Sequence, residues 1–396
     1  MNGMLRRNVL VSIISAALCQ VVVAQDVYTP VLEMVLENSS MLRAYGAVRD
    51  ASVAESRTGL APDNPEVEAG YLFGNELTGD RRDISIRQNF EFPTVYVQKG
   101  RLADTRLETA GYQYRLQRQE LLLEAKRLCI ELIYNNARLN ICSRKLDASA
   151  QINDSYRRMA AQGEVNAIEL NKAASAYASA KLEYANGEAE RQRIIAELKR
   201  LCGGKDVTFD SDSFPEIKLP ADFDGWWAGI RQSHPLIQYM QSTTMESEQE
   251  VKLALSSWIP KFSVGYMGEF VPGEPFQGIT AGITLPLWEN KGKVRAARAA
   301  EQAAKASLED AVTSLENSFR ALYSHCVAIT QGLSVYDEAT QGDDSAELLR
   351  KALEQGEISL LTYVQEYDYL YGVLMQRLQA QRELAIAYAE LTAVSL

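Results

Sequence analysis

Histidine, cysteine and long apolar segments are scarce in this sequence of 396 residues. Its two histidines, His234 and His325, stand far apart, and no nucleophile–base pair or metal-ligand spacing surrounds either of them. The sequence therefore predicts neither an enzyme nor a resident metal or cofactor. Beyond the N-terminal region, no apolar run is long enough to cross a bilayer as a helix.

Positive charge is limited as well. The chain has 41 lysines and arginines against 52 aspartates and glutamates, which gives a net charge of −11. Binding to nucleic acid depends on basic patches, so we do not expect a nucleic-acid partner.

Residues 1–24 have the pattern of a secretory signal peptide. The basic pair Arg6 and Arg7 precedes an apolar stretch, and Ala24 supplies the small residue before the cut. Cleavage would remove these two arginines and no acidic residue, so the net charge would change from −11 to −13. Lipidation of Cys19 is an alternative, although the residue before it is a poor one for that modification.

Four cysteines remain after such a cleavage, namely Cys129, Cys142, Cys202 and Cys326. An even number in a secreted chain permits disulfides. Cys129 and Cys142 lie on one predicted helix, about 20 Å apart at 1.5 Å per residue, so they cannot bond to each other. The favoured interpretation is that all four are small apolar residues packed between helices.

The sequence repeats itself at a fixed internal distance. Pro286 follows Pro93 by 193 residues, and Gln355-Gly356-Glu357 follows Gln162-Gly163-Glu164 by the same 193 residues. An internal period has to be settled before any local pattern is interpreted. This one is about half the chain long, so we predict a tandem duplication.

The two repeats are predicted to share one plan, with a strand hairpin and a helical hairpin in each. The first repeat covers residues 25–204, a linker follows at 205–225, and the second repeat covers 226–396. Before the first strands, residues 26–60 are expected to be helical. The strand hairpins are expected at about 66–92 and 261–286, and the helical hairpins at about 98–202 and 290–395.

The expected strands alternate apolar and polar residues, which is the two-residue period of a strand with one apolar side. The apolar positions are Val67, Ala69, Tyr71, Phe73, Ile84, Ile86, Phe90, Phe92, Phe262, Val264, Tyr266, Phe270, Ile279, Ala281, Ile283 and Leu285. Four strands cannot close a barrel, but several copies could pool their strands into one closed barrel, as a bilayer requires. Two hairpins packed on a soluble core remain the alternative at this point.

The helical hairpins carry a heptad seam, in which the core positions alternate steps of four and three residues. In the first repeat the seam covers residues 121–160 and resumes over 170–201, on either side of a turn at Gly163. The arm from Gln98 to Ala161 alone would be about 95 Å long at 1.5 Å per residue, far longer than the helices of globular domains. We therefore predict a rod-like coiled coil.

Duplicated units of this kind behind a signal peptide resemble the TolC-type outer membrane efflux proteins of Gram-negative bacteria. The resemblance covers residues 26–396 and is carried by the ordered duplication, the two Gln-Gly-Glu turns and a second pair of motifs. These motifs are Phe92-Pro93 with Gln98-Lys99-Gly100-Arg101, and Leu285-Pro286 with Asn290-Lys291-Gly292-Lys293. The resemblance implies a mostly α fold with four strands per chain, which trimerises into a 12-stranded β-barrel on a periplasmic tunnel of 12 helices.

The resemblance also implies a location and partners. The homotrimer would sit in outer membrane lipid, extend into the periplasm, and meet a periplasmic adaptor of an inner-membrane pump. It would passively conduct small molecules such as drugs or metal ions, without a cofactor. A type I secretion channel for proteins and a soluble periplasmic scaffold or adaptor remain alternatives.

On this resemblance, residues at the two helix turns are candidates for contact with the adaptor. They are Arg157, Gly163, Val165, Ile168, Arg350, Gly356, Ile358 and Leu361. The glycines would supply left-handed backbone geometry, and the flanking apolar residues would be exposed unless a partner covered them. The alternative is that these residues only close the coiled coil.

Some members of the family narrow the tunnel with carboxylates six and nine residues after the second turn glycine. Here those two positions hold Thr362 and Gln365, and Glu366 and Asp368 lie slightly further along. These four residues are candidates for the tunnel entrance. The sequence does not predict an acidic ring or cation-sensitive gating there.

Overall fold

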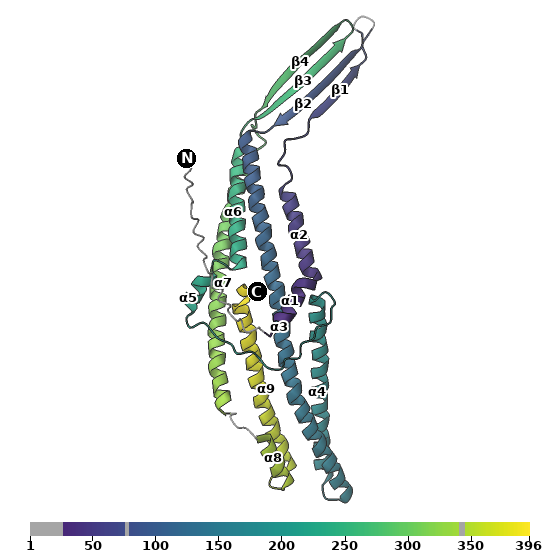
Figure 1. Ribbon diagram of the computed structural model, residues 1–396, viewed down its shortest axis with the longest axis vertical. Coiled ribbons are helices and arrows are strands. Elements are labelled where there is room, and N and C mark those ends of the chain that lie inside the picture. The colour runs from purple at the N-terminus through teal and green to yellow at the C-terminus, as the bar shows by residue number, and fades with distance from the viewer. Residues whose placement is uncertain (1–26, 76–78, 340–344) are drawn as a thin grey trace, which may run out of the picture.

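The computed structural model describes residues 27–75, 79–339 and 345–396, which form a long helical body with a β-sheet at one end (Figure 1). The predicted signal peptide over 1–24, with Cys19, lies outside the described residues. The helices are α1 (Thr29–Asn38), α2 (Ser40–Ser56), α3 (Pro93–Gln162), α4 (Ala167–Leu201), α5 (Phe223–Ile230), α6 (Pro235–Ser256), α7 (Lys293–Ala339), α8 (Ser345–Glu354) and α9 (Leu360–Leu391), followed by a 3-10 turn (Ala393–Ser395). The strands are β1 (Glu66–Leu72), β2 (Arg81–Phe90), β3 (Lys261–Val271) and β4 (Glu274–Thr284).

The first repeat contains the predicted rod. α3 continues over 70 residues, which is about 105 Å at 1.5 Å per residue. It begins at Pro93, five residues earlier than expected, because the first helical turn needs no N–H donor and therefore accepts proline. The predicted seam is confirmed, since positions such as Leu132 of α3 and Leu198 of α4 are almost fully buried.

Three boundaries differ from the sequence-based prediction. The helix expected over 26–60 is two helices, because Ser39 has an extended backbone and its Oγ accepts the Leu42 N–H at 3.4 Å to begin α2. The linker ends earlier than expected, because Asp222 caps α5. In the second repeat the first arm of the helical hairpin comprises α7 and α8, and residues 340–344 between them lie outside the described part.

The four strands form one antiparallel sheet in the order β1-β2-β3-β4, and its central pair, β2 with β3, joins the two repeats. The register places the predicted apolar positions opposite one another. Val67 faces Ile86, which faces Tyr266, which in turn faces Ile279. Since side chains alternate along each strand, the sheet has one mainly apolar face, interrupted by Arg82 and Gln88 of β2, and one more polar face.

Among the residues that the structure describes, none covers the apolar face of the sheet as a core would. Val67, Val264 and Ile279 are exposed by 69%, 52% and 85%. The alternative of two hairpins packed on a soluble core is therefore wrong for this chain. Among the described strands, β1 and β4 each have one neighbour, so each leaves an edge of backbone N–H and C=O groups without a strand partner.

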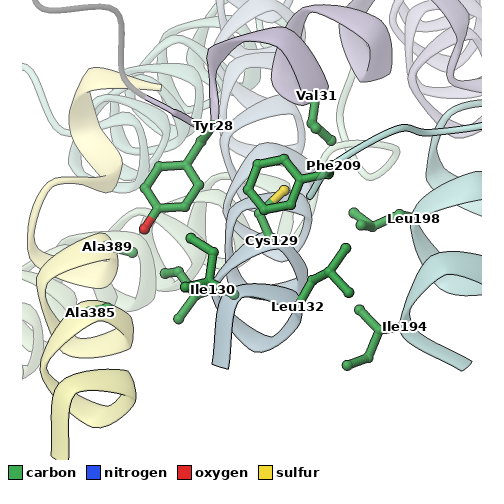
Figure 2. Packing of buried hydrophobic residues seen from close by; sticks show 11 residues of the cluster. Tyr28, Val31, Cys129, Ile130, Leu132, Ile194, Leu198, Phe209, Ala385 and Ala389 are labelled. Atoms are coloured by element: carbon green, nitrogen blue, oxygen red, sulfur yellow. The ribbon is translucent and has the colours of Figure 1, made fainter. Parts of the chain in front are cut away.

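A hydrophobic core near the middle of the molecule brings both repeats together (Figure 2). Figure 2 shows residues of α1, α3, α4, α9, the linker and the position before α1 converging on it: Tyr28, Val31, Cys129, Ile130, Leu132, Ile194, Leu198, Phe209, Ala385 and Ala389. Cys129 is one of four buried cysteines in the described chain, which confirms that they serve as small packed residues. Within the described ranges, no helix is both long and apolar enough to cross a membrane.

Candidate functional site

The two helix turns lie at the end of the rod opposite to the sheet (Figure 1). Gly163 ends α3 with φ of 75°, and the N–H groups of Gly163 and Glu164 donate to carbonyls three and five residues earlier, at 3.1 and 2.9 Å. Gly356 has φ of 73°, and the corresponding two bonds are again 3.1 and 2.9 Å long. The predicted left-handed glycines are confirmed, and the duplication extends to individual hydrogen bonds.

Each turn is followed at once by a residue that starts the next helix. Asn166 accepts two backbone N–H groups of α4 at 2.9 and 3.0 Å, and Glu169 completes a capping box with it. Ser359 accepts the Thr362 N–H at 3.2 Å to begin α9. A Cβ added to either turn glycine would meet nothing within 4 Å, so glycine is required for its positive φ and not for space.

The apolar residues predicted beside the turns divide into two kinds. Val165 and Ile358 are half-buried, whereas Ile168 and Leu361 are exposed by 68% and 45%. Ile168 and Leu361 come from different repeats, yet they line the same groove between α4 and α9. The structure thus joins two predicted contact residues in one surface.

The groove has a volume of about 780 Å³, and Lys145 of α3 contributes to its floor. The Lys145 Nζ lies 3.2 Å from a Glu183 oxygen of α4, 3.2 Å from an Asp368 oxygen of α9, and 4.2 Å from the centroid of the Tyr371 ring. Burial lowers the pKa of Lys145, but the ion pairs with Asp368 and Glu183 outweigh burial and leave that pKa above its ordinary value. Lys145 is therefore a charged link among three helices.

One wall of the groove is aromatic. Tyr363, Tyr367 and Tyr371 stand four residues apart on one face of α9, and the first two rings stack with centroids 5.5 Å apart. The Tyr371 hydroxyl lies 2.9 Å from the Cys142 sulfur. Burial raises the pKa of Tyr363 to about 12, so this wall is uncharged at neutral pH. The groove was not predicted from the sequence, in which the four-residue spacing of the tyrosines was the available signal.

The remaining predicted residues do not gather in the groove. Arg157 is exposed on α3, and Arg350 pairs within α8 with Glu347 at 2.6 Å and Glu354 at 2.5 Å. The hydrogen bonds from Arg350 hold the pKa of Glu347 below its ordinary value. The predicted contact residues therefore do not form one site. Some form the two turns, Ile168 and Leu361 line the groove, and the two arginines lie outside both.

The four candidates for the tunnel entrance have different surroundings. The Thr362 hydroxyl lies 2.9 Å from the Ser359 hydroxyl and belongs to the start of α9. Gln365 and Glu366 are exposed, whereas Asp368 is directed to Lys145. In the single chain these residues form no common cluster.

The more buried histidine has a structural explanation. The His234 Nδ1 accepts the Leu236 N–H at 3.2 Å at the start of α6, and its ring packs on Phe319 with centroids 5.6 Å apart. Burial lowers the pKa of His234 to about 4. In the part of the chain that the structure describes, no three His, Cys, Asp or Glu side chains are placed to hold a metal ion.

Several solved structures have a fold similar to that of this chain. No protein-family model and no curated protein sequence matches the chain. Among solved structures, the CmeC outer membrane channel of Campylobacter jejuni has a TM-score of 0.77 at 15% identity, over 93% of this chain and 85% of that one.

Two further outer membrane proteins have similar structures. The MtrE outer membrane channel of Neisseria gonorrhoeae, in its open state, has a TM-score of 0.73 at 15% identity, over 93% of this chain and 88% of that one. The outer membrane protein VceC of Vibrio cholerae has a TM-score of 0.71 at 16% identity, over 93% of this chain and 94% of that one. At such identities the similarity is one of fold, and at that level it confirms the resemblance found in the sequence.

Proposed function

We propose that the chain is the outer membrane exit duct of a tripartite efflux system in a Gram-negative cell, and that three copies form one channel. It conducts small molecules such as drugs or metal ions from a periplasmic adaptor and an inner-membrane pump to the exterior. The duct performs no reaction and needs no cofactor. The observation that carries the proposal is the sheet, because an exposed apolar face and two open edges occur together in it.

The open edges favour a closed ring of copies. If β4 of one copy pairs with β1 of the next, three copies form 12 strands and no edge is left unpaired in lipid. The 11 residues of β3 extend about 36 Å at 3.3 Å per residue, or about 28 Å across the membrane at a tilt of 40°. This length matches an apolar band about 25 Å tall.

The other face of the sheet suits the interior of such a ring. It has Asp83, Arg87, Ser263 and Thr280, which alternate with the apolar positions along their strands. Polar and charged residues of this kind line the water-filled interior of membrane barrels. The two faces of the sheet thus correspond to lipid and to the conduit.

At the opposite end, the groove between α4 and α9 is the proposed contact for the adaptor. Its rim has the exposed Ile168 and Leu361, and its wall is the tyrosine face of α9. Exposed apolar side chains at the rim of an aromatic-lined groove are typical of a site for another protein. The turn residues Arg157 and Arg350 would lie beside that contact.

The mass of the purified mature protein in detergent tests the proposal. Light scattering corrected for bound detergent should give three chains per particle extracted from the outer membrane. A monomer that stays soluble without detergent would overturn the channel and support the soluble periplasmic scaffold.

Photo-crosslinking in cells tests the groove. A photo-crosslinking residue in place of Ile168 should form an adduct with a periplasmic adaptor, whereas the same residue in place of Leu182 should not. Leu182 is a matched control because it is 62% exposed on the same helix and does not line the groove. Adducts at both positions or at Leu182 alone would contradict the groove contact. An adaptor that belongs to a protein exporter would favour the type I secretion alternative.

A further inference from the structure

A basic surface lies where the sheet meets the helical body. Lys291, Lys293, Arg295 and Arg298 fall within eight residues at the start of α7, in a chain of net charge −11. We refer to these four residues as the junction cluster. All four are exposed, and in the described part of the chain none of them forms an ion pair. Lys293 donates instead to the Asn290 Oδ1 at 2.8 Å, so the positive charge of the cluster is not neutralised within the chain.

The corresponding segment of the first repeat is different. There Lys99 pairs with Glu91 at 2.6 Å, and both side chains are less than one-third exposed. Arg101, two residues further along α3, is exposed. The duplication has therefore kept the segment but has left a concentrated, unpaired positive charge only in the second repeat. A requirement of the sheet-to-helix connection itself would apply to both repeats, so the second repeat has an additional role here.

Tryptophan accompanies the junction cluster. A pocket of about 520 Å³ is lined by Trp258, Arg295 and Arg298, among other residues. Trp258 is 44% exposed, and Trp288, in the segment between β4 and α7, is 79% exposed. The buried Asn290 donates to the Ser257 carbonyl and so holds this segment beside Trp258.

The combination of exposed tryptophans and basic side chains indicates which kind of molecule binds to this surface. Exposed tryptophans concentrate at the level of lipid headgroups, because the ring is apolar while the indole N–H remains hydrogen-bonded. Guanidinium groups bind phosphate oxygens in a bidentate manner. The junction cluster also lies directly beyond the end of the apolar sheet face, at Ile283 of β4.

We propose that the junction cluster, together with Trp258 and Trp288, binds the phosphate of anionic phospholipids at the periplasmic boundary of the membrane. This inference rests on the proposed channel, which puts the apolar sheet face in lipid and the start of α7 just outside it. The lipid would fix the depth of the sheet in the membrane at one end. Electrostatic attraction to the anionic surface and burial of the tryptophans would both contribute to the free energy of binding.

Brominated lipids provide the test, because bromine quenches nearby tryptophan. Trp258 and Trp288 lie at the junction, whereas Trp226 and Trp227 of α5 pack in the helical body and serve as an internal background. The full mature chain is reconstituted into phosphatidylcholine vesicles that contain a minor fraction of brominated phosphatidylglycerol or of brominated phosphatidylcholine. We expect several-fold stronger quenching by phosphatidylglycerol at the same mole fraction.

Charge variants identify the source of that preference. Arg295→Gln with Arg298→Gln should bring the ratio of quenching by the two lipids close to one, because each arginine near an anionic surface contributes up to about a fivefold enrichment. Arg295→Lys with Arg298→Lys keeps the charge and should retain most of the preference. Lys181→Gln with Lys218→Gln removes the same charge from exposed positions elsewhere and should leave the preference unchanged.

The possible failures can be told apart. Equal quenching by both lipids, in protein that fully brominated phosphatidylcholine does quench, would overturn the lipid site and leave the channel in place. A preference that survives the glutamine variants would overturn the role of Arg295 and Arg298. Absence of quenching even in fully brominated phosphatidylcholine would show that the junction is outside the membrane, and would overturn both proposals.

Discussion

The two helical hairpins share their turns and differ in how they are packed. Gly163 and Gly356 have nearly the same φ, and the hydrogen bonds around them correspond. The first hairpin closes tightly, since Gly187 of α4 allows close approach of the Leu139 side chain of α3. The Gly187 carbonyl also accepts a hydrogen bond from the buried Asn135 amide at 2.9 Å. In the second hairpin, α8 has no buried residue. A turn depends on a few local residues, whereas packing depends on a whole seam. The two repeats have therefore kept the same turn geometry while their packing has diverged.

The second hairpin contacts the first through α9. α9 meets α3 through the Lys145 ion pair with Asp368 and through the contact between Tyr371 and Cys142. α8 packs mainly on α9 and exposes Leu348 by 62%. The first hairpin is therefore the scaffold at this end of the molecule, and the second presents more surface to a neighbouring copy or another protein.

The largest expected effect on stability comes from removing a buried side chain of the heptad seam. Leu132→Ala should lower the free energy of unfolding by about 2–5 kcal/mol, because it leaves a cavity in the main core. Leu348→Ala in α8 should change it by no more than about 0.5 kcal/mol, because this side chain is exposed. Denaturant titration of the detergent-solubilised protein measures both. Equal losses would mean that the assembled protein covers α8, and the contrast between the hairpins would then hold only for the single chain.

The turn glycines should give equal, intermediate effects. Gly163→Ala and Gly356→Ala should each cost about 1–2 kcal/mol in unfolding free energy, because an L-residue is strained at a left-handed φ. Gly111→Ala is the control. Gly111 lies inside α3 with open space at its Cβ, so alanine should stabilise the protein by about 0.5–1 kcal/mol. Clearly unequal losses at the two turns would show that their strain differs despite the matching hydrogen bonds.

Much of this fold could be predicted because periodicity and local geometry determine it. The 193-residue repeat, the heptad seam and the alternating strands each depend on spacing, and the turn glycines depend on φ alone. The break at Ser39 was missed because the apolar spacing continues across it, while one side-chain hydrogen bond decides where α2 begins.

The groove could not be predicted in the same way. It depends on α4 and α9 lying side by side, although Ile168 and Leu361 are 193 residues apart in the sequence. Asp368 was predicted near the tunnel entrance, but its partner Lys145 comes from the other repeat, and no period in the sequence relates the two. Contacts of this kind follow from tertiary packing, so only the structure reveals them.

The smallest expected effect comes from breaking the link between the hairpins. Lys145→Met should cost about 0.5–1 kcal/mol at neutral pH, because Glu183 and Asp368 are partly exposed and water can solvate them after the lysine is removed. The pKa of Lys145 is raised in the folded state above its ordinary value of 10.5. Its stabilisation is therefore complete below pH 10.5 and is lost as the pH rises through the folded-state pKa.

The difference in unfolding free energy between the wild type and Lys145→Met should accordingly stay constant from neutral pH to about pH 10 and then vanish. Lys181→Met is the matched control, since Lys181 is exposed on α4, where its Nζ lies 6.0 Å from the centroid of the Tyr177 ring. Hydrogen exchange should rise in the first turns of α9 and remain unchanged in α4, because α4 keeps its own seam with α3. A difference that already shrinks near neutral pH would mean that burial, and not ion pairing, dominates the Lys145 site. Faster exchange in α4 as well would show that the first hairpin depends on the second, which would reverse the relation between scaffold and supported hairpin.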